Sequence, residues 1–398
     1  MPYRRDLLKG LGYGALAASM PGISLASAET DSRLVVMILR GAADGLAMLA
    51  PYGEPGYSGL RGQLALAPPG TEGGLLKLDG LFGLHPSFTF LHGLYQENQV
   101  LPIHAVATPY RERSHFDAQN LLENGTTQPG GARDGWLNRA LAPLNDSSGK
   151  ETAIAMAQNT PLILRGSEAA SSWSPSTLPD ADEETLRRIR KLYENDEFFA
   201  SRLQQALESQ DIAGDLSSSS RRRNKLRQSK EMMQATARFL KTPDGPRIAV
   251  IESGGWDTHF NQGAATGSLA NKFRDLDSNL NDFKQAMGSA WSSTVVAVVT
   301  EFGRTVRVNG TRGTDHGTAA VALLLGGAID GGRIIADWPG LQTSALYEGR
   351  DLKPTLDLRS IFKGVLADHL DIDSAFLDQK VFPDSGSIAV MDGLIRKT

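Results

Sequence analysis

Two histidines and three carboxylates lie close together in the sequence between residues 253 and 318. They are Asp257, His259, Glu301, Asp315 and His316. Imidazole nitrogens and carboxylate oxygens are ligands that proteins offer to divalent ions such as Zn, Mn, Ca and Mg. The same groups also act as general acids and bases. This stretch therefore predicts a divalent-metal site or an acid–base site.

Two apolar runs rich in β-branched residues set the position of these side chains. The run 248–251 comes before Asp257 and His259, and the run 295–299 ends just before Glu301. Such runs are typical of buried parallel strands, and open α/β sheets bind ligands at the carboxyl ends of their strands. We therefore expect these three side chains to meet at one edge of a sheet.

The rest of the chain alternates strand-like runs with amphipathic patterns. The run 33–39 predicts a central strand, and apolar residues at helical spacing predict a helix over 269–287. This alternation predicts a three-layer α/β/α sandwich that forms a single domain over 29–398. A charged, helical stretch at about 180–240 interrupts the strand pattern, and we interpret it as an insertion in that domain.

Several candidate residues have a purely structural alternative. Asp44 follows the first strand, where a ligand would lie, but Asp44-Gly45 is also a turn signal. Ser114 could be a nucleophile or an anion ligand at a helix start, or simply the N-cap of that helix. Glu301 and Arg304 could pair with each other, or Glu301 could bind a metal while Arg304 holds a substrate oxyanion.

The remaining motifs also leave alternatives open. Asp257 and His259 could belong to an ordinary exposed loop. Asp315 and His316 lie between two glycines, where they could form a turn. They could equally supply the ligand pair, which would leave Glu301 with a structural role. Two further histidines could contribute, His85 and His115.

Composition and the N-terminal segment bound the class of protein. With 398 residues, 40% hydrophobic and 22% charged, the chain is globular, and its net charge of −4 does not suggest nucleic acid as a partner. It has no cysteine, which excludes disulfides and thiolate ligands. Residues 1–28 combine Arg4-Arg5, an apolar stretch and the small residues 26–28, as in a twin-arginine signal. We therefore expect export by the twin-arginine translocase to the periplasm or the outside, with no transmembrane segment after the signal.

Six motifs occur in an order that resembles one family of exported bacterial proteins. They span 40–46, 84–86, 114–119, 255–259, 300–305 and 313–317. The family is domain-of-unknown-function family 1501, and the resemblance covers essentially the whole chain after residue 28. That family is grouped with the alkaline phosphatases and sulfatases. The resemblance therefore implies an alkaline phosphatase-like α/β/α fold with a metal site at the carboxyl edge of its sheet.

The resemblance also implies roles for particular residues. Ser114 matches the nucleophile region, and the matched metal ligands are Asp44, Asp257, His259, Glu301 and His316. Three departures stand out: the pair is Asp-x-His instead of Asp-x-x-x-His, Phe302 stands where a histidine ligand would be, and Ser114 lacks the surrounding Pro and Arg of a sulfatase-type nucleophile. One of the two metals of that superfamily could therefore be missing here.

The combined expectation is an exported, metal-dependent hydrolase of phosphate or sulfate esters, with a small-molecule or polysaccharide ester as substrate. One ion would be held by Asp44, Asp257 and His259 together with His316 or Asp315. Ser114 or a metal-bound water would attack the ester, and Arg304 would hold the oxyanion. The alternative is a non-catalytic binding or envelope-assembly protein that keeps the scaffold with an eroded metal site.

Overall fold

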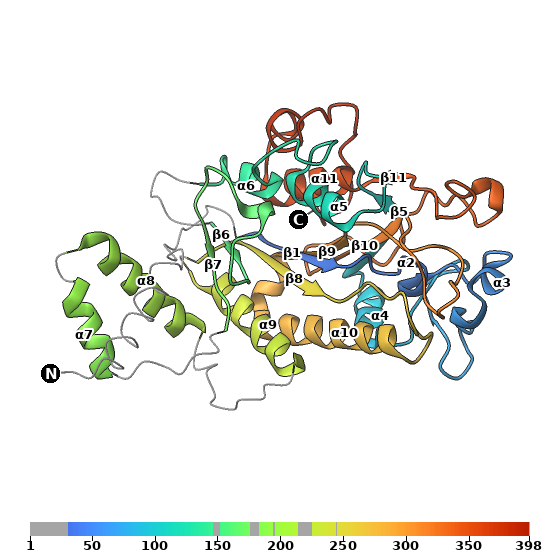
Figure 1. The fold of residues 1–398 in the computed structure, drawn as a ribbon, viewed down its shortest axis with the longest axis horizontal. Helices are drawn as coiled ribbons and strands as arrows, with labels where there is room; N and C mark the ends of the chain where they lie inside the picture. Colours follow the sequence, from blue (N-terminus) through green and yellow to red (C-terminus); the bar gives the residue numbers. More distant parts are fainter. Residues whose placement is uncertain are drawn as a thin grey trace.

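A central mixed sheet organises the structure, a computed structural model that describes residues 31–145, 152–175, 183–193, 196–213, 225–243 and 245–397. The sheet has eight strands (Figure 1). Their order across it is β11 (Leu356–Asp357), β5 (Val100–Ala107), β10 (Ala320–Leu325), β9 (Thr294–Thr300), β1 (Arg33–Arg40), β8 (Ile248–Gly254), β6 (Ala153–Ala155) and β7 (Ala170–Ser172). The signal predicted at 1–28 lies outside the described residues.

Strand β10 runs against its neighbours in an otherwise parallel sheet. It pairs antiparallel with β9 and β5, whereas β1 pairs parallel with β8 and β9. The start of β10 therefore lies at the same edge as the ends of β1, β5, β8 and β9. Four segments that leave strands and one that enters a strand come together at this edge.

Alternate residues of each central strand supply two apolar cores, because successive side chains of a strand point to opposite faces. In β1, Val35 and Met37 join one core, and Leu34 and Val36 join the other. The first core is covered by α4 (Thr89–Gln96), α9 (Lys225–Lys241) and α10 (Ser268–Met287), and the second by α5 (His115–Asn124), α6 (Trp136–Leu141) and α11 (Leu358–Leu370) (Figure 1). The predicted three-layer α/β/α architecture is confirmed.

Local sequence explains where one covering helix ends and where another begins. Helix α10 buries Phe273, Leu276, Leu280 and Phe283 at helical spacing, and it ends at Gly288, which has a φ of 58° that glycine adopts without strain. Helix α11 begins after Asp357, whose side chain accepts the backbone N–H of Arg359 at 2.8 Å and so caps the helix.

Smaller elements decorate the sandwich. A second sheet has the order β2 (Leu49–Ala50), β4 (Gly83–Leu84) and β3 (Leu76–Lys77). The short helices are α2 (Gly45–Met48), α3 (Tyr57–Arg61) and α12 (Ser374–Phe376). Single 3₁₀ or π turns form at Gly62–Leu64, Leu162–Leu164, Gly288–Ser293, Thr343–Ala345 and Leu377–Val381.

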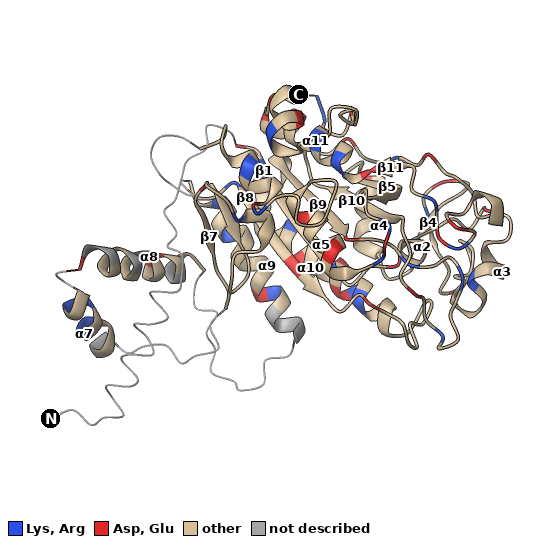
Figure 2. Cartoon of the chain, turned by 45° about the horizontal axis from the view of Figure 1, so that its top comes forward, with Lys and Arg blue, Asp and Glu red and all other residues tan. Residues whose placement is uncertain are grey.

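Three helices lie in the stretch at about 180–240. Helices α7 (Glu183–Tyr193) and α8 (Glu197–Ala213) lie beyond β7, at the end of the molecule opposite α3 (Figure 1). Helix α9 packs against α10 and buries Phe239 and Leu240 in the first core, so it is part of the covering layer. Acidic and basic residues are interspersed along the chain (Figure 2). None of the helices in the described residues has the length and apolarity needed to cross a bilayer.

Candidate metal centre

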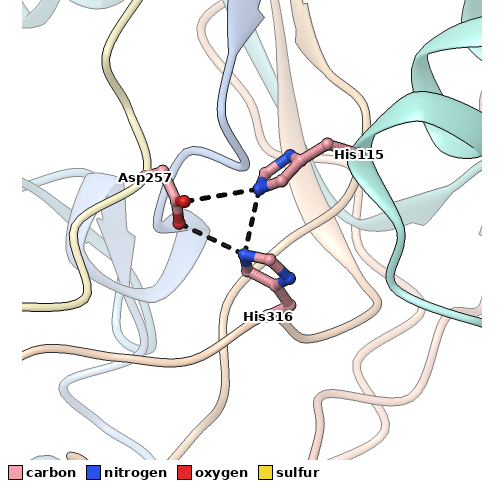
Figure 3. A group of neighbouring side chains, drawn as sticks. All are labelled: His115, Asp257 and His316. Atoms are coloured by element: carbon pink, nitrogen blue, oxygen red, sulfur yellow. Dashed lines mark hydrogen bonds and ion pairs between the residues drawn. The ribbon is translucent and has the colours of Figure 1, made fainter.

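Side chains from three distant segments converge at the carboxyl edge of the sheet (Figure 3). His115 begins α5, Asp257 follows β8 and His316 precedes β10. Nε2 of His115 lies 2.9 Å from Nε2 of His316 and 3.5 Å from Oδ2 of Asp257. Nε2 of His316 lies 3.3 Å from Oδ1 of Asp257. Metal–nitrogen bonds of about 2.1 Å place neighbouring ligands of a tetrahedral ion roughly 3.4 Å apart, so this spacing suits one shared ion.

A third imidazole lies beside this group. Nε2 of His259 is 3.0 Å from Nε2 of His316 and 3.0 Å from Oδ1 of Asp257. Asp257 and His259, two residues apart in the sequence, therefore approach the same point. The predicted pair is brought together with His316.

Each of these imidazoles is held through its other nitrogen, Nδ1. The acceptors are Oε1 of Glu301 for His115 (2.8 Å), Oδ1 of Asp315 for His259 (3.1 Å) and the carbonyl oxygen of Arg113 for His316 (3.0 Å). A neutral imidazole that donates from Nδ1 keeps the lone pair of Nε2 free for a metal. Carboxylates and carbonyls behind histidine ligands commonly fix their orientation in this way. The arrangement of donors therefore fits a divalent ion.

Glu301 lies behind His115 and is 1% exposed. Its Oε1 also accepts the backbone N–H of Gly41 at 2.8 Å and the side-chain amide of Gln119 at 3.1 Å. Burial alone would raise the pKa of Glu301, but the hydrogen bonds from His115, Gln119 and Gly41 lower it below its usual value. Its hydrogen bond in turn raises the pKa of His115 above the usual value. Glu301 is thus an ionised anchor for the His115 ring.

Arg304 holds Asp257 from within the protein. Its Nη1 donates to Oδ1 of Asp257, Nε donates to Oγ1 of Thr314 at 3.1 Å, and Nη2 donates to the carbonyl oxygen of Thr314. Burial would raise the pKa of Asp257, but Arg304, and after it the charges of His259 and His316, lower it. Asp257 therefore presents an ionised carboxylate to the centre.

The converging residues fall within one family match. The family described as "Protein of unknown function (DUF1501)" matches residues 85–381, which is most of the chain. This chain belongs to the DUF1501 family. No curated protein matches it by sequence.

Solved structures of other proteins also match the DUF1501 chain. The lipoteichoic acid synthase LtaP from Listeria monocytogenes is 10% identical, with a TM-score of 0.38, over 92% of this chain and 81% of that one. The phosphonate monoester hydrolase of Agrobacterium radiobacter is 12% identical, with a TM-score of 0.37, over 86% and 74%. A protein in the alkaline phosphatase superfamily from Vibrio parahaemolyticus is 12% identical, with a TM-score of 0.34, over 81% and 67%. None of these three likenesses assigns a reaction to the DUF1501 chain.

Asp44 is fully buried and makes its contacts outside the group formed by His115, Asp257 and His316. Its Oδ2 pairs with Nη2 of Arg61 and accepts from Nε2 of Gln262 at 2.7 Å, and its Oδ1 caps α2 through the N–H of Ala47. Gln262 then accepts the hydroxyl of Thr314 at 2.7 Å, the same hydroxyl that accepts from Arg304. Asp44 is thus linked to the centre through a chain of hydrogen bonds, whereas Asp257 lies in it.

Ser114 precedes His115 at the N-terminal end of α5. It occupies the N-cap position, but its side chain makes no capping hydrogen bond, although the backbone carbonyl accepts the N–H of Ala118 at 2.9 Å. Ser114 is half-buried, and its side chain hydrogen-bonds that of Tyr110. The helix cap alone therefore does not account for the hydroxyl at this position.

The two further candidate histidines, His85 and His115, lie in different places. His115 lies in the centre, while Nε2 of His85 bonds the carbonyl oxygen of Ala264 at 2.9 Å in the core beside Phe273. Phe302 lies near the position expected of a histidine ligand and stacks its ring on His115, with centroids 4.9 Å apart. In the sequence, the sign that favours His115 is its place at a helix start after a buried strand.

Proposed function

We propose that this DUF1501 protein is an exported, metal-dependent hydrolase of phosphate or sulfate esters. The observation that supports the proposal most strongly is the convergence of the Nε2 atoms of His115, His259 and His316 on the Asp257 carboxylate. Without an ion, free lone pairs and a carboxylate gathered at such distances would repel one another. A divalent cation offsets that repulsion.

The proposed ligands of one ion are His115, Asp257 and His316, with His259 beside them. A donor set dominated by imidazole suits Zn better than Mn, Ca or Mg, which prefer oxygen. When bound, the ion would act as a Lewis acid on an ester oxygen. In this proposal Glu301 and Asp315 orient ligands.

Two residues would act next to the ion. Ser114 Oγ, or a water, would attack the phosphorus or sulfur of the ester and displace its alcohol, because the serine lies one residue before a ligand and its hydroxyl is not engaged in capping α5. With Ser114 as nucleophile, a water would then release the phosphate or sulfate from the serine. Nε, Nη1 and Nη2 of Arg304 already donate to protein acceptors, so we assign Arg304 to holding Asp257 in place. The substrate oxyanion would then be held by other groups.

Export is part of the same proposal. The twin-arginine pattern of residues 1–28 would direct the chain to the translocase and then to the periplasm or beyond. An Arg4→Lys, Arg5→Lys variant should accumulate inside the cell without processing, whereas the wild-type chain should appear outside the inner membrane and shortened. Equal export of both chains would contradict this part.

Metal analysis and activity together test the function. We expect about one Zn per purified chain, a loss of most of it in Asp257→Ala and His316→Ala, and full retention in His92→Ala, which changes a histidine on α4. A panel of phosphate and sulfate esters should then be hydrolysed by the wild-type chain and by His92→Ala, with the activity abolished by a chelator. A metal-free wild-type chain, or a metal-bound chain that hydrolyses no ester in the panel, would overturn the proposal and favour a binding protein.

A further inference from the structure

Large apolar side chains are exposed next to the metal centre. Among the described residues, the large hydrophobic residues with most of their surface exposed are Phe116 (89% exposed), Leu192 (73%) and Phe260 (65%). Phe116 directly follows His115 and Phe260 directly follows His259, whereas Leu192 is on α7. Exposed apolar rings that are grouped near a site indicate a binding surface, because exposing apolar area to water costs free energy.

The two phenylalanines each follow a histidine that approaches the same point. Nε2 of His115 and Nε2 of His259 lie 2.9 and 3.0 Å from Nε2 of His316. Since neighbouring Cα atoms are about 3.8 Å apart, the Cα atoms of Phe116 and Phe260 both lie within roughly 12 Å of that nitrogen. Two exposed phenylalanines are therefore attached to backbone that lies next to a polar centre.

The backbone that presents Phe260 is fixed on both sides. The carbonyl oxygen of His259 accepts from Nδ2 of Asn309 at 3.0 Å and from the hydroxyl of Thr311. The N–H of Asn261 bonds the carbonyl oxygen of Thr311 at 3.0 Å, and Asn261 has a φ of 44°. A residue held with positive φ next to a site indicates a conformation that its surroundings impose.

Phe116 is also held in place, because it lies in the first turn of α5. The backbone of that turn is fixed by the bond from the N–H of Ala118 to the carbonyl of Ser114, and His115 is anchored to Glu301. The exposure of both rings is thus a property of ordered segments. Ordered apolar groups reduce the entropy cost of binding a partner.

We propose that Phe116 and Phe260 form an apolar rim that binds a flat ring on the alcohol side of the substrate, so that the preferred substrates are aryl esters. This inference rests on the proposed function, which places the charged ester group at the histidines. A phenyl side chain has no hydrogen-bonding group, so it selects a ligand by apolar contact and by ring stacking or edge contact. A substrate with a charged head and an apolar ring matches both parts of the site.

Binding of non-hydrolysable ligands tests the rim separately from turnover. The probes are phenylphosphonate, methylphosphonate and hexylphosphonate, and the matching sulfonates, titrated calorimetrically into the metal-loaded chain. We expect phenyl ligands to bind about tenfold or more tightly than methyl ligands, from the extra apolar area removed from water. Phe116→Ala and Phe260→Ala should each reduce this ratio at least about threefold while methyl ligands bind as before. Leu192→Ala, an exposed apolar residue on α7, is the matched control and should leave the ratio unchanged.

The outcomes separate the rim from the proposed function. Phenyl and methyl ligands of equal affinity, or a ratio that survives both phenylalanine substitutions, would overturn the rim and leave the hydrolase standing. Hexyl ligands that bind more tightly than phenyl ligands, in a manner lost with Phe116→Ala, would overturn the aryl assignment in favour of an alkyl chain. If none of the phosphonates or sulfonates bound, the proposed function would fail, and the rim with it.

Discussion

Oε1 of Glu301 accepts a hydrogen bond from Nδ1 of His115 at 2.8 Å, so that the opposite nitrogen of the ring points at His316 and Asp257. This carboxylate ends a buried strand and has its own hydrogen-bond donors, yet it meets the centre only through the imidazole. In the proposed metal centre it would orient the ligand His115, a position from which it would affect how strongly an ion is held.

Replacing Glu301 with glutamine should weaken metal binding without removing it. The amide keeps the shape of the side chain but loses the charge that makes His115 a better donor, and such outer partners are commonly worth about 10- to 100-fold in affinity. The metal dissociation constant, measured by competition with a chromophoric chelator, gives the change. Glu97→Gln, which alters a surface pair with Lys284, is the control. An unchanged dissociation constant for Glu301→Gln would contradict the orienting role.

Replacing Arg304 should destabilise the protein even without metal. Arg304→Met leaves Asp257 without its partner and both oxygens of Thr314 without their donor, and we expect a loss of about 2–3 kcal/mol in the free energy of unfolding, less than for a wholly buried pair because Asp257 is partly exposed. Arg304→Lys should recover under half of it, because an ammonium lacks the planar fork. Urea unfolding in the presence of a chelator measures both. Full recovery by lysine would show that the charge alone matters.

Replacing Asp44 should separate stability from metal binding. Asp44 and Arg61 are both 0% exposed, so Asp44→Ala leaves an unpaired buried guanidinium at a cost of about 3–5 kcal/mol. The folded fraction of Asp44→Ala should nevertheless retain its metal, unlike Asp257→Ala. Metal content after gel filtration and urea unfolding of the same samples give the two quantities. Loss of the metal from folded Asp44→Ala would instead make Asp44 a ligand, as first expected from its position after a strand.

His104 should make the fold sensitive to acid. It is wholly buried, its Nδ1 accepts the N–H of Ala105 at 2.7 Å, and burial lowers its pKa from 6.5 to about 4. As the pH falls from about 6.5 to 4, His104 becomes protonated in the unfolded chain but stays neutral in the folded chain. The free energy of unfolding therefore keeps its full value above about pH 6.5 and decreases, by about 3 kcal/mol at most, as the pH falls to about 4.

Unfolding by urea at pH 7.5, 6 and 5 measures this dependence. His104→Gln should lower stability at pH 7.5 yet lose less of it on acidification than the wild-type chain. His92→Gln, which changes a histidine on the outer side of α4, should follow the wild-type slope. Parallel slopes for the wild-type chain and His104→Gln would show that His104 contributes nothing to acid sensitivity.

The strands were the most predictable part of the fold. Continuous apolar runs predicted β1, β8 and β9 to within a few residues, since a strand buried on both faces has little choice of composition. The direction of β10 was not predictable, because an apolar run reads the same for either direction. That direction is what brings His316 to the edge where Asp257 lies.

The site was predictable as a set of segments more than as a set of roles. Spacing pointed to Asp257, His259 and His316, which the structure brings together. Spacing did not show that Glu301 lies behind His115 and not at the centre itself. The two positions differ only by the length of one hydrogen bond, 2.8 Å between Oε1 of Glu301 and Nδ1 of His115. Nor did spacing rank His115 above His85, although the place of His115 at a helix start after a buried strand was a sign that favoured it.

The centre joins parts of the chain that are far apart in the sequence. His115 and His316 are separated by 201 residues, and Asp257 and His316 by 59. His316 is the last of these side chains to be synthesised, when most of the protein has been made. The proposed set of ligands would therefore be complete only in a nearly finished chain, and a chain that ended before His316 would lack one of its members.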